Sequence, residues 1–117
     1  LDMQDELQDG KSSEHGDGLL HTAIASATHN VIWLHMMHTV LHVMDDYLKL
    51  IWHNVYLSYE DRELLFNQHC AVVAAIKGKQ AQSAYDRMLE HLNFAEQKSI
   101  NFLSQHSLRE LLPQHYA

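Results

Sequence analysis

An aspartate and a histidine stand four positions apart in the stretch GDGLLHTAIASATHN, residues 16–30. On an α-helix, positions i and i+4 lie on one face, so Asp17 and His21 would present a carboxylate and an imidazole to the same point. Taken alone, Asp17 has a simple explanation as an acid in a first helical turn, where it favours the helix dipole. The apolar face that they would share includes Ile24, Ala25 and Thr28.

Two further histidines are predicted to point inward from two other helices. On a helical wheel His69 falls at the centre of an apolar face, and His91 falls on the apolar side of a later helix. Cys70 is rotated by roughly 100° from His69 and is therefore not expected to bind the same ion as a co-ligand. The apolar neighbours expected around the two histidines are Leu65, Val72, Val73 and Ile76 for His69, and Met88, Ala95 and Phe102 for His91.

A single core histidine is more often a hydrogen-bonded packing residue than a ligand. A carboxylate and three imidazoles buried together without partners would, however, cost several kcal/mol, and a divalent cation removes that cost. We therefore expect Asp17, His21, His69 and His91 to bind a metal ion. Three nitrogens and one oxygen suit zinc, our first choice, and also nickel, manganese, cobalt or iron. Vacant positions on such an ion would bind a small carboxylate.

The elements that must position these residues are all predicted to be helical. We expect helices from Glu14 or His15 to Thr28, from 30 to 57, from about 59 to 77 and from near Gln80 to 103, without strand-like alternation. Asn30 and Ser58 are the expected N-terminal caps, and Gly78 the expected helix stop. The fold class is therefore all-α, an antiparallel helical bundle.

The helix over 30–57 carries two distinct sets of side chains. The expected core stripe follows helical spacing, whereas four histidines lie outside it and are interpreted as solvated or interface residues. Ile32, Met36 and Val43 broaden the apolar surface beyond the stripe, which favours a homodimer. The stripe is Trp33, Met37, Val40, Met44, Leu48 and Ile51, and the four histidines are His35, His38, His42 and His53.

The length of 117 residues predicts one domain, which we divide into three parts. Residues 1–13 look like the end of a preceding helix and a loop, 14–105 carry the motifs, and 106–117 form a tail, so we expect a fragment that lacks its first helices. A net charge of −7 with eight Lys and Arg disfavours direct contact with nucleic acid. The single cysteine and the absence of an apolar run of roughly 18 residues predict a cytoplasmic protein without membrane contact.

Three motifs in order resemble the FadR-type C-terminal effector-binding (FCD) domain of GntR-family transcription regulators: DGLLHTAIASATHN, QHCAVVAAIKGK and AYDRMLEHL. Asp17, His21, His69 and His91 occupy the ligand positions of that family. HNVIWLHMM and LSYEDRELL look most similar to the pyruvate dehydrogenase complex regulator and the lactate-responsive regulators within it.

This resemblance implies a sensor domain rather than an enzyme. It implies a dimeric bundle that holds a metal, binds a small organic acid such as pyruvate or lactate, and controls operator DNA through an N-terminal winged helix not present here, as a repressor. Two alternatives are a helical-bundle metalloenzyme and a structural helical module in which the histidines only pack. The enzyme would need an inward acid or base beyond the ligands, and none is found.

Overall fold

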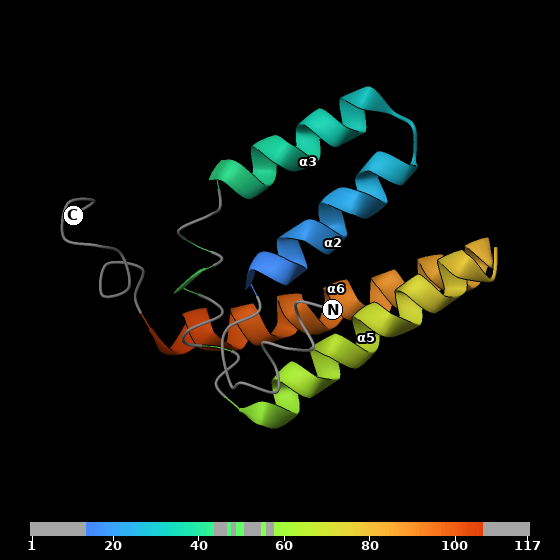
Figure 1. The fold of residues 1–117 in the computed structure, drawn as a ribbon. Helices are drawn as coiled ribbons and strands as arrows, with labels where there is room; N and C mark the ends of the chain where they lie inside the picture. The colour runs from blue at the N-terminus through green and yellow to red at the C-terminus, as the bar shows by residue number, and fades with distance from the viewer. Residues whose placement is uncertain (1–13, 44–46, 48, 51–54, 56–57, 107–117) are drawn as a thin grey trace. The chain divides into compact units, whose positions relative to one another are not determined.

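The computed structural model describes residues 14–43, 47, 49–50, 55 and 58–106. Within these ranges the chain forms four helices and no strand, as the all-α prediction requires (Figure 1). The chain divides into two compact units, residues 1–59 and 60–117. No described helix is long and apolar enough to cross a membrane.

The first unit contains a helical hairpin of α2 (Glu14–Ala27) and α3 (Val31–Val43), which pack against each other (Figure 1). The turn between them passes through His29, whose φ of 55° is left-handed. Asn30 then caps α3, because its Oδ1 accepts hydrogen bonds from the backbone N–H groups of Ile32 and Trp33, both at 3.1 Å. The predicted cap and the predicted helix start are both confirmed.

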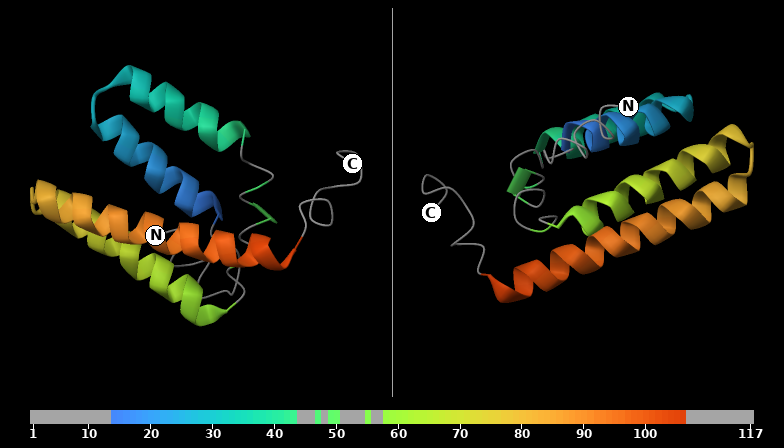
Figure 2. Two further views of the ribbon diagram at one scale, coloured as in Figure 1. Left: turned by 180° about the vertical axis from the view of Figure 1, so that it is seen from behind. Right: turned by 60° about the horizontal axis from the view of Figure 1, so that its bottom comes forward.

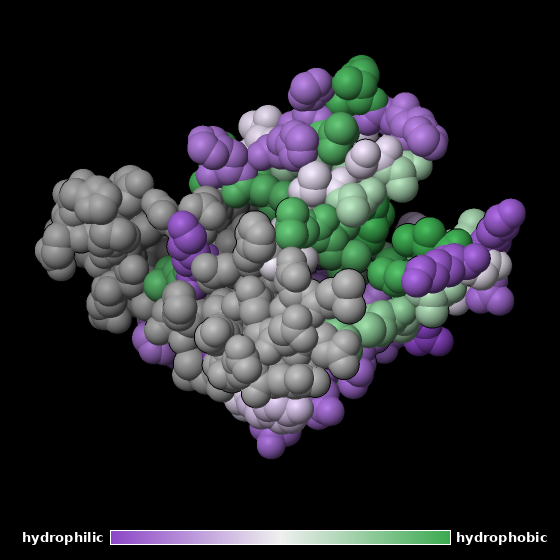
Figure 3. Space-filling view, in the orientation of Figure 1, coloured by the Kyte–Doolittle hydropathy of each residue, from purple (hydrophilic) through white to green (hydrophobic). Residues whose placement is uncertain are grey.

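The core stripe predicted for α3 is wrong at Trp33 and Val40, whereas Met37 is partly covered, and no residue of α3 is buried. Trp33 and Val40 are 47% and 48% exposed, and the partly covered row is Leu34, Met37 and Leu41. Apolar residues cover a wide sector of α3 opposite its histidines, so helical spacing could not identify which part of that sector packs. Figure 3 shows apolar side chains at the surface in this region. The exposure of His35, His38 and His42 is as predicted.

The second unit is built on a longer hairpin of α5 (Tyr59–Lys77) and α6 (Ala81–Gln105). Helix α5 begins and ends where the sequence predicted, with Gly78 directly after its last residue. The backbone N–H of Gly78 donates to the carbonyl of Ala74 at 2.9 Å, and the left-handed residue of the turn is Lys79, with φ 56°. The helix stop is thus confirmed, but the left-handed position follows Gly78.

The register of α5 against α6 is set by pairs of residues equally far from this turn. Near the open end, Lys98 Nζ donates to Asp61 Oδ2 at 2.8 Å, and the same ammonium lies 5.7 Å from the centre of the Phe94 ring. Nearer the turn, His69 meets His91. The two helices are therefore antiparallel, as Figure 2 also shows.

Three predicted segments lie partly or wholly outside the described residues. They are the helix end and loop over 1–13, most of the helix predicted beyond Val43, and the tail over 106–117 apart from residue 106.

Candidate metal site

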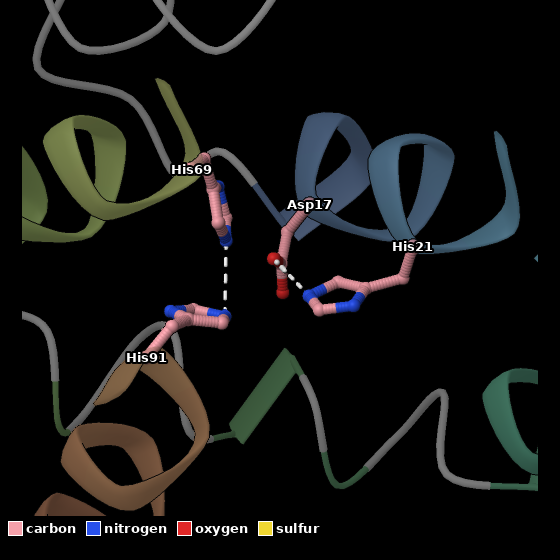
Figure 4. A group of neighbouring side chains, drawn as sticks. All are labelled: Asp17, His21, His69 and His91. Carbon is pink, nitrogen blue, oxygen red and sulfur yellow. Dashed lines mark hydrogen bonds and ion pairs between the residues drawn. The ribbon is translucent and has the colours of Figure 1, made fainter. Parts of the chain in front are cut away.

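Asp17 and His21 lie on one face of α2, as their spacing predicted. His21 Nε2 lies 3.2 Å from Asp17 Oδ1, and about a fifth of each side chain is exposed, 18% and 20% respectively (Figure 4). Ala25, one turn further along, is buried as predicted. Thr28 is exposed instead of sharing this face, and its hydroxyl donates to the carbonyl of Ala25 at 2.6 Å. Its place after the last helical residue explains the difference, because the helix ends at Ala27.

His69 and His91 face each other from α5 and α6. Their Nε2 atoms are 3.1 Å apart, and the two rings meet edge to face with centroids 4.4 Å apart (Figure 4). Only 3% of His69 and 4% of His91 is exposed. Both histidines are therefore buried, as the wheel analysis predicted, and the antiparallel register brings them together.

The apolar face around His69 is mostly as predicted. Leu65 and Val72 are each 2% exposed and flank the histidine one turn before and one turn after it. Ile76 is the exception, since it is exposed, and Ala75 is buried in its place near the end of α5. Cys70 is exposed, which agrees with its predicted rotation away from His69.

Gln68 is a residue of this region that the sequence analysis missed. Its Oε1 lies 3.1 Å from Nδ1 of His91. An amide oxygen only accepts hydrogen bonds, so this contact assigns the proton of a neutral His91 ring to Nδ1 and leaves Nε2 with a lone pair. A wheel drawn for α5 alone cannot reveal this contact, because the partner is on α6. The sequence signal is the register, since residues 68 and 91 lie at equal distances on the two sides of the turn, as residues 61 and 98 also do.

The histidine pair fits the requirements of a metal ion. Two nitrogens at the usual 2.0–2.1 Å from one zinc ion and 3.1 Å from each other would subtend about 100° at the metal, between octahedral and tetrahedral geometry. Without an ion, one ring must donate its proton to the other. Each of the four predicted ligands carries one suitable donor atom, an imidazole nitrogen or a carboxylate oxygen.

The helical fold agrees with the family to which this chain belongs. Residues 2–94 match the model of the FCD domain, so the chain is a member of the FCD domain family. It is an effector-binding domain of the kind found in transcription regulators, and not an enzyme, as the motifs indicated.

Two curated relatives give a more specific likeness. In Escherichia coli (strain K12) and in Shigella flexneri, a protein named "Putative L-lactate dehydrogenase operon regulatory protein" is 32% identical to this chain over 87 residues. The match covers 74% of this chain and 34% of each relative, so the chain spans about a third of their length. No solved structure matches the chain significantly.

Proposed function

We propose that this chain is the metal-dependent sensor of a small organic acid within a DNA-binding transcription regulator. The metal ion is divalent, with zinc favoured and nickel, manganese, cobalt or iron as alternatives. Its ligands are one carboxylate and three imidazoles, provided in pairs by the two units: Asp17, His21, His69 and His91.

The observation that carries this proposal is the buried pair His69 and His91. Their Nε2 atoms converge at 3.1 Å, and Gln68 holds the proton of His91 on the far side of its ring. Two imidazole nitrogens at such a separation are suited to chelate one ion. The Asp17–His21 pair contributes the only carboxylate of the proposed ligand set, and about a fifth of each side chain is exposed.

The proposed effector is a carboxylate of the size of lactate or pyruvate. A divalent ion with four protein ligands retains vacant positions when it is five- or six-coordinate, and a carboxylate oxygen is a suitable additional ligand. The names of the two relatives refer to an operon for L-lactate dehydrogenase, which favours L-lactate among such acids.

The proposed partners are operator DNA and a second copy of the chain. The net charge of −7 supports DNA contact through another part of the regulator, an N-terminal winged helix, and we propose repression in the cytoplasm as its mode of action. A homodimer is supported by the exposed apolar side chains of α3, among them Ile32, Met36 and Val43. Sedimentation equilibrium of the purified chain tests this, and a monomer at all concentrations would contradict it.

Metal analysis combined with calorimetry tests the sensor. The purified chain should contain about one divalent ion, should lose thermal stability in a chelator, and should bind L-lactate or pyruvate only after the ion is restored. His69→Ala should remove metal and acid binding together. His42→Ala is the matched control, because His42 is an exposed histidine on α3, and this variant should behave as the unmodified chain does.

Two results would overturn the proposal. A chelator that leaves the melting temperature unchanged would favour packed histidines without a metal. Acid binding that persists in the His69→Ala variant would show that the effector does not depend on this ion.

A further inference from the structure

We propose that Gln68 is a positioning residue for the metal site. Its amide oxygen accepts the hydrogen bond from Nδ1 of His91, so that the unprotonated Nε2 is directed at the ion. This inference rests on the metal site of the proposed function and adds a residue to it. Gln68 itself is no ligand in this arrangement.

Contacts at both ring nitrogens of His91 support this role. Nδ1 lies 3.1 Å from Gln68 Oε1, and Nε2 lies 3.1 Å from His69 Nε2. A metal-binding histidine commonly donates its other ring N–H to an oxygen acceptor, which selects the tautomer and the ring orientation. Gln68 places an acceptor at Nδ1, and only 4% of His91 is exposed, so water is a poor substitute.

The contact between Gln68 and His91 joins α5 to α6, so it depends on how the two helices of the hairpin pack. Gln68 and His69 are consecutive, so one short segment of α5 supplies both a ligand and the group that orients the ligand from α6. A neutral imidazole can otherwise exchange its tautomers, and its χ2 torsion has a broad, roughly two-fold preference. Loss of the Gln68 oxygen would let His91 direct a protonated nitrogen or a ring carbon at the ion.

Nitrogen NMR of the metal-free chain, together with zinc titration calorimetry, tests the proposal. In the unmodified chain, long-range coupling in the 15N-labelled ring should show His91 protonated on Nδ1. Gln68→Met keeps the length of the side chain but removes the acceptor, so it should give mixed tautomers and weaken zinc binding about 10–100-fold. Gln68→Glu retains an oxygen at this position and should restore both the tautomer and the affinity.

Gln97→Met is the matched control. Gln97 is an exposed glutamine on α6 whose side chain donates to Asn101 at 3.0 Å. It has the same functional group as Gln68 but is not part of the proposed metal site. This variant should leave the His91 tautomer and the zinc affinity unchanged.

The two readouts separate this proposal from the metal site on which it rests. If Gln68→Met binds zinc as tightly as the unmodified chain and keeps the Nδ1 tautomer, the role of Gln68 is overturned while the metal site stands. If the unmodified chain binds no zinc, the metal site is overturned, and the metal-free NMR spectrum still decides whether Gln68 orients His91.

Discussion

The two helical hairpins carry their donor residues in different ways. In the first, Asp17 and His21 lie on one helix, are set by the helix pitch, and keep about a fifth of each side chain exposed. In the second, His69 and His91 lie on different helices, are set by the register of the hairpin, and are almost completely buried. A pair on one helix survives any rearrangement that keeps the helix, whereas the buried pair depends on the packing of α5 against α6.

The turns of the two hairpins also differ in how they start the next helix. Both turns pass through one left-handed residue with a side chain, His29 or Lys79. The first turn continues with Asn30, whose side chain caps α3, whereas Gln80 makes no side-chain cap for α6. The two hairpins therefore differ in whether a side chain caps the helix that follows the turn.

The largest contrast is expected when one donor of each pair is removed from the metal-free chain. His69→Ala leaves a cavity and a buried imidazole facing it, and should lower the free energy of unfolding by about 2–3 kcal/mol. Asp17→Ala removes a partly exposed i,i+4 pair and should cost less than about 1 kcal/mol. Urea denaturation in a chelator measures both. Equal losses of unfolding free energy in the two variants would contradict the effect expected from the difference in burial between the pairs.

Removal of the cap tests the difference between the turns. Asn30→Ala leaves the N–H groups of Ile32 and Trp33 without the cap oxygen, and should cost about 1 kcal/mol of stability. Gln80→Ala is the matched control at the start of α6 and should change stability by only a few tenths of a kcal/mol, because no cap bond is lost. Thermal denaturation of both variants measures this, and a larger loss for Gln80→Ala would reverse the comparison.

The glycines of the two hairpins should respond differently to alanine. A Cβ at Gly18 in α2 would meet no atom within 4 Å, so Gly18→Ala should raise stability by about 0.5–1 kcal/mol through helix propensity. A Cβ at Gly78 would lie 3.3 Å from the carbonyl oxygen of Ala74, which is a tight contact. Gly78→Ala should therefore raise the stability by less than Gly18→Ala does, or should lower it. Differential scanning calorimetry of the two variants measures this difference.

The smallest effect concerns the ion pair that sets the register of the second hairpin. Lys98 and Asp61 are partly exposed, 34% and 22% of their side chains, so their coupling should be about 0.5 kcal/mol. A double-mutant cycle of Lys98→Met and Asp61→Asn measures it. The exposed pair Arg87 and Glu90, on α6 alone, is the matched control and should couple more weakly. Stronger coupling within α6 would contradict a special role for the inter-helix pair.

The sequence predicted the described helices to within a few residues wherever a cap or stop residue stood beside them. Asn30, the step from Ser58 to Tyr59, and Gly78 each mark an end that the structure confirms. The packing side of α3 could not be predicted, because apolar residues cover a sector of that helix wider than the row that packs. Gln68 was missed for another reason, since its contact with His91 depends on the register between two helices and not on the periodicity of either.

The most direct test of a shared ion is cobalt binding by an Asp17→Cys variant. If this position and His69 ligate one ion, the new thiolate should give a sulfur-to-cobalt charge-transfer band that the unmodified chain, with Cys70 alone, lacks. Adding His69→Ala should abolish the band. A chain that binds cobalt without the band, or a band that persists in the double variant, would show that the two pairs do not hold the same metal.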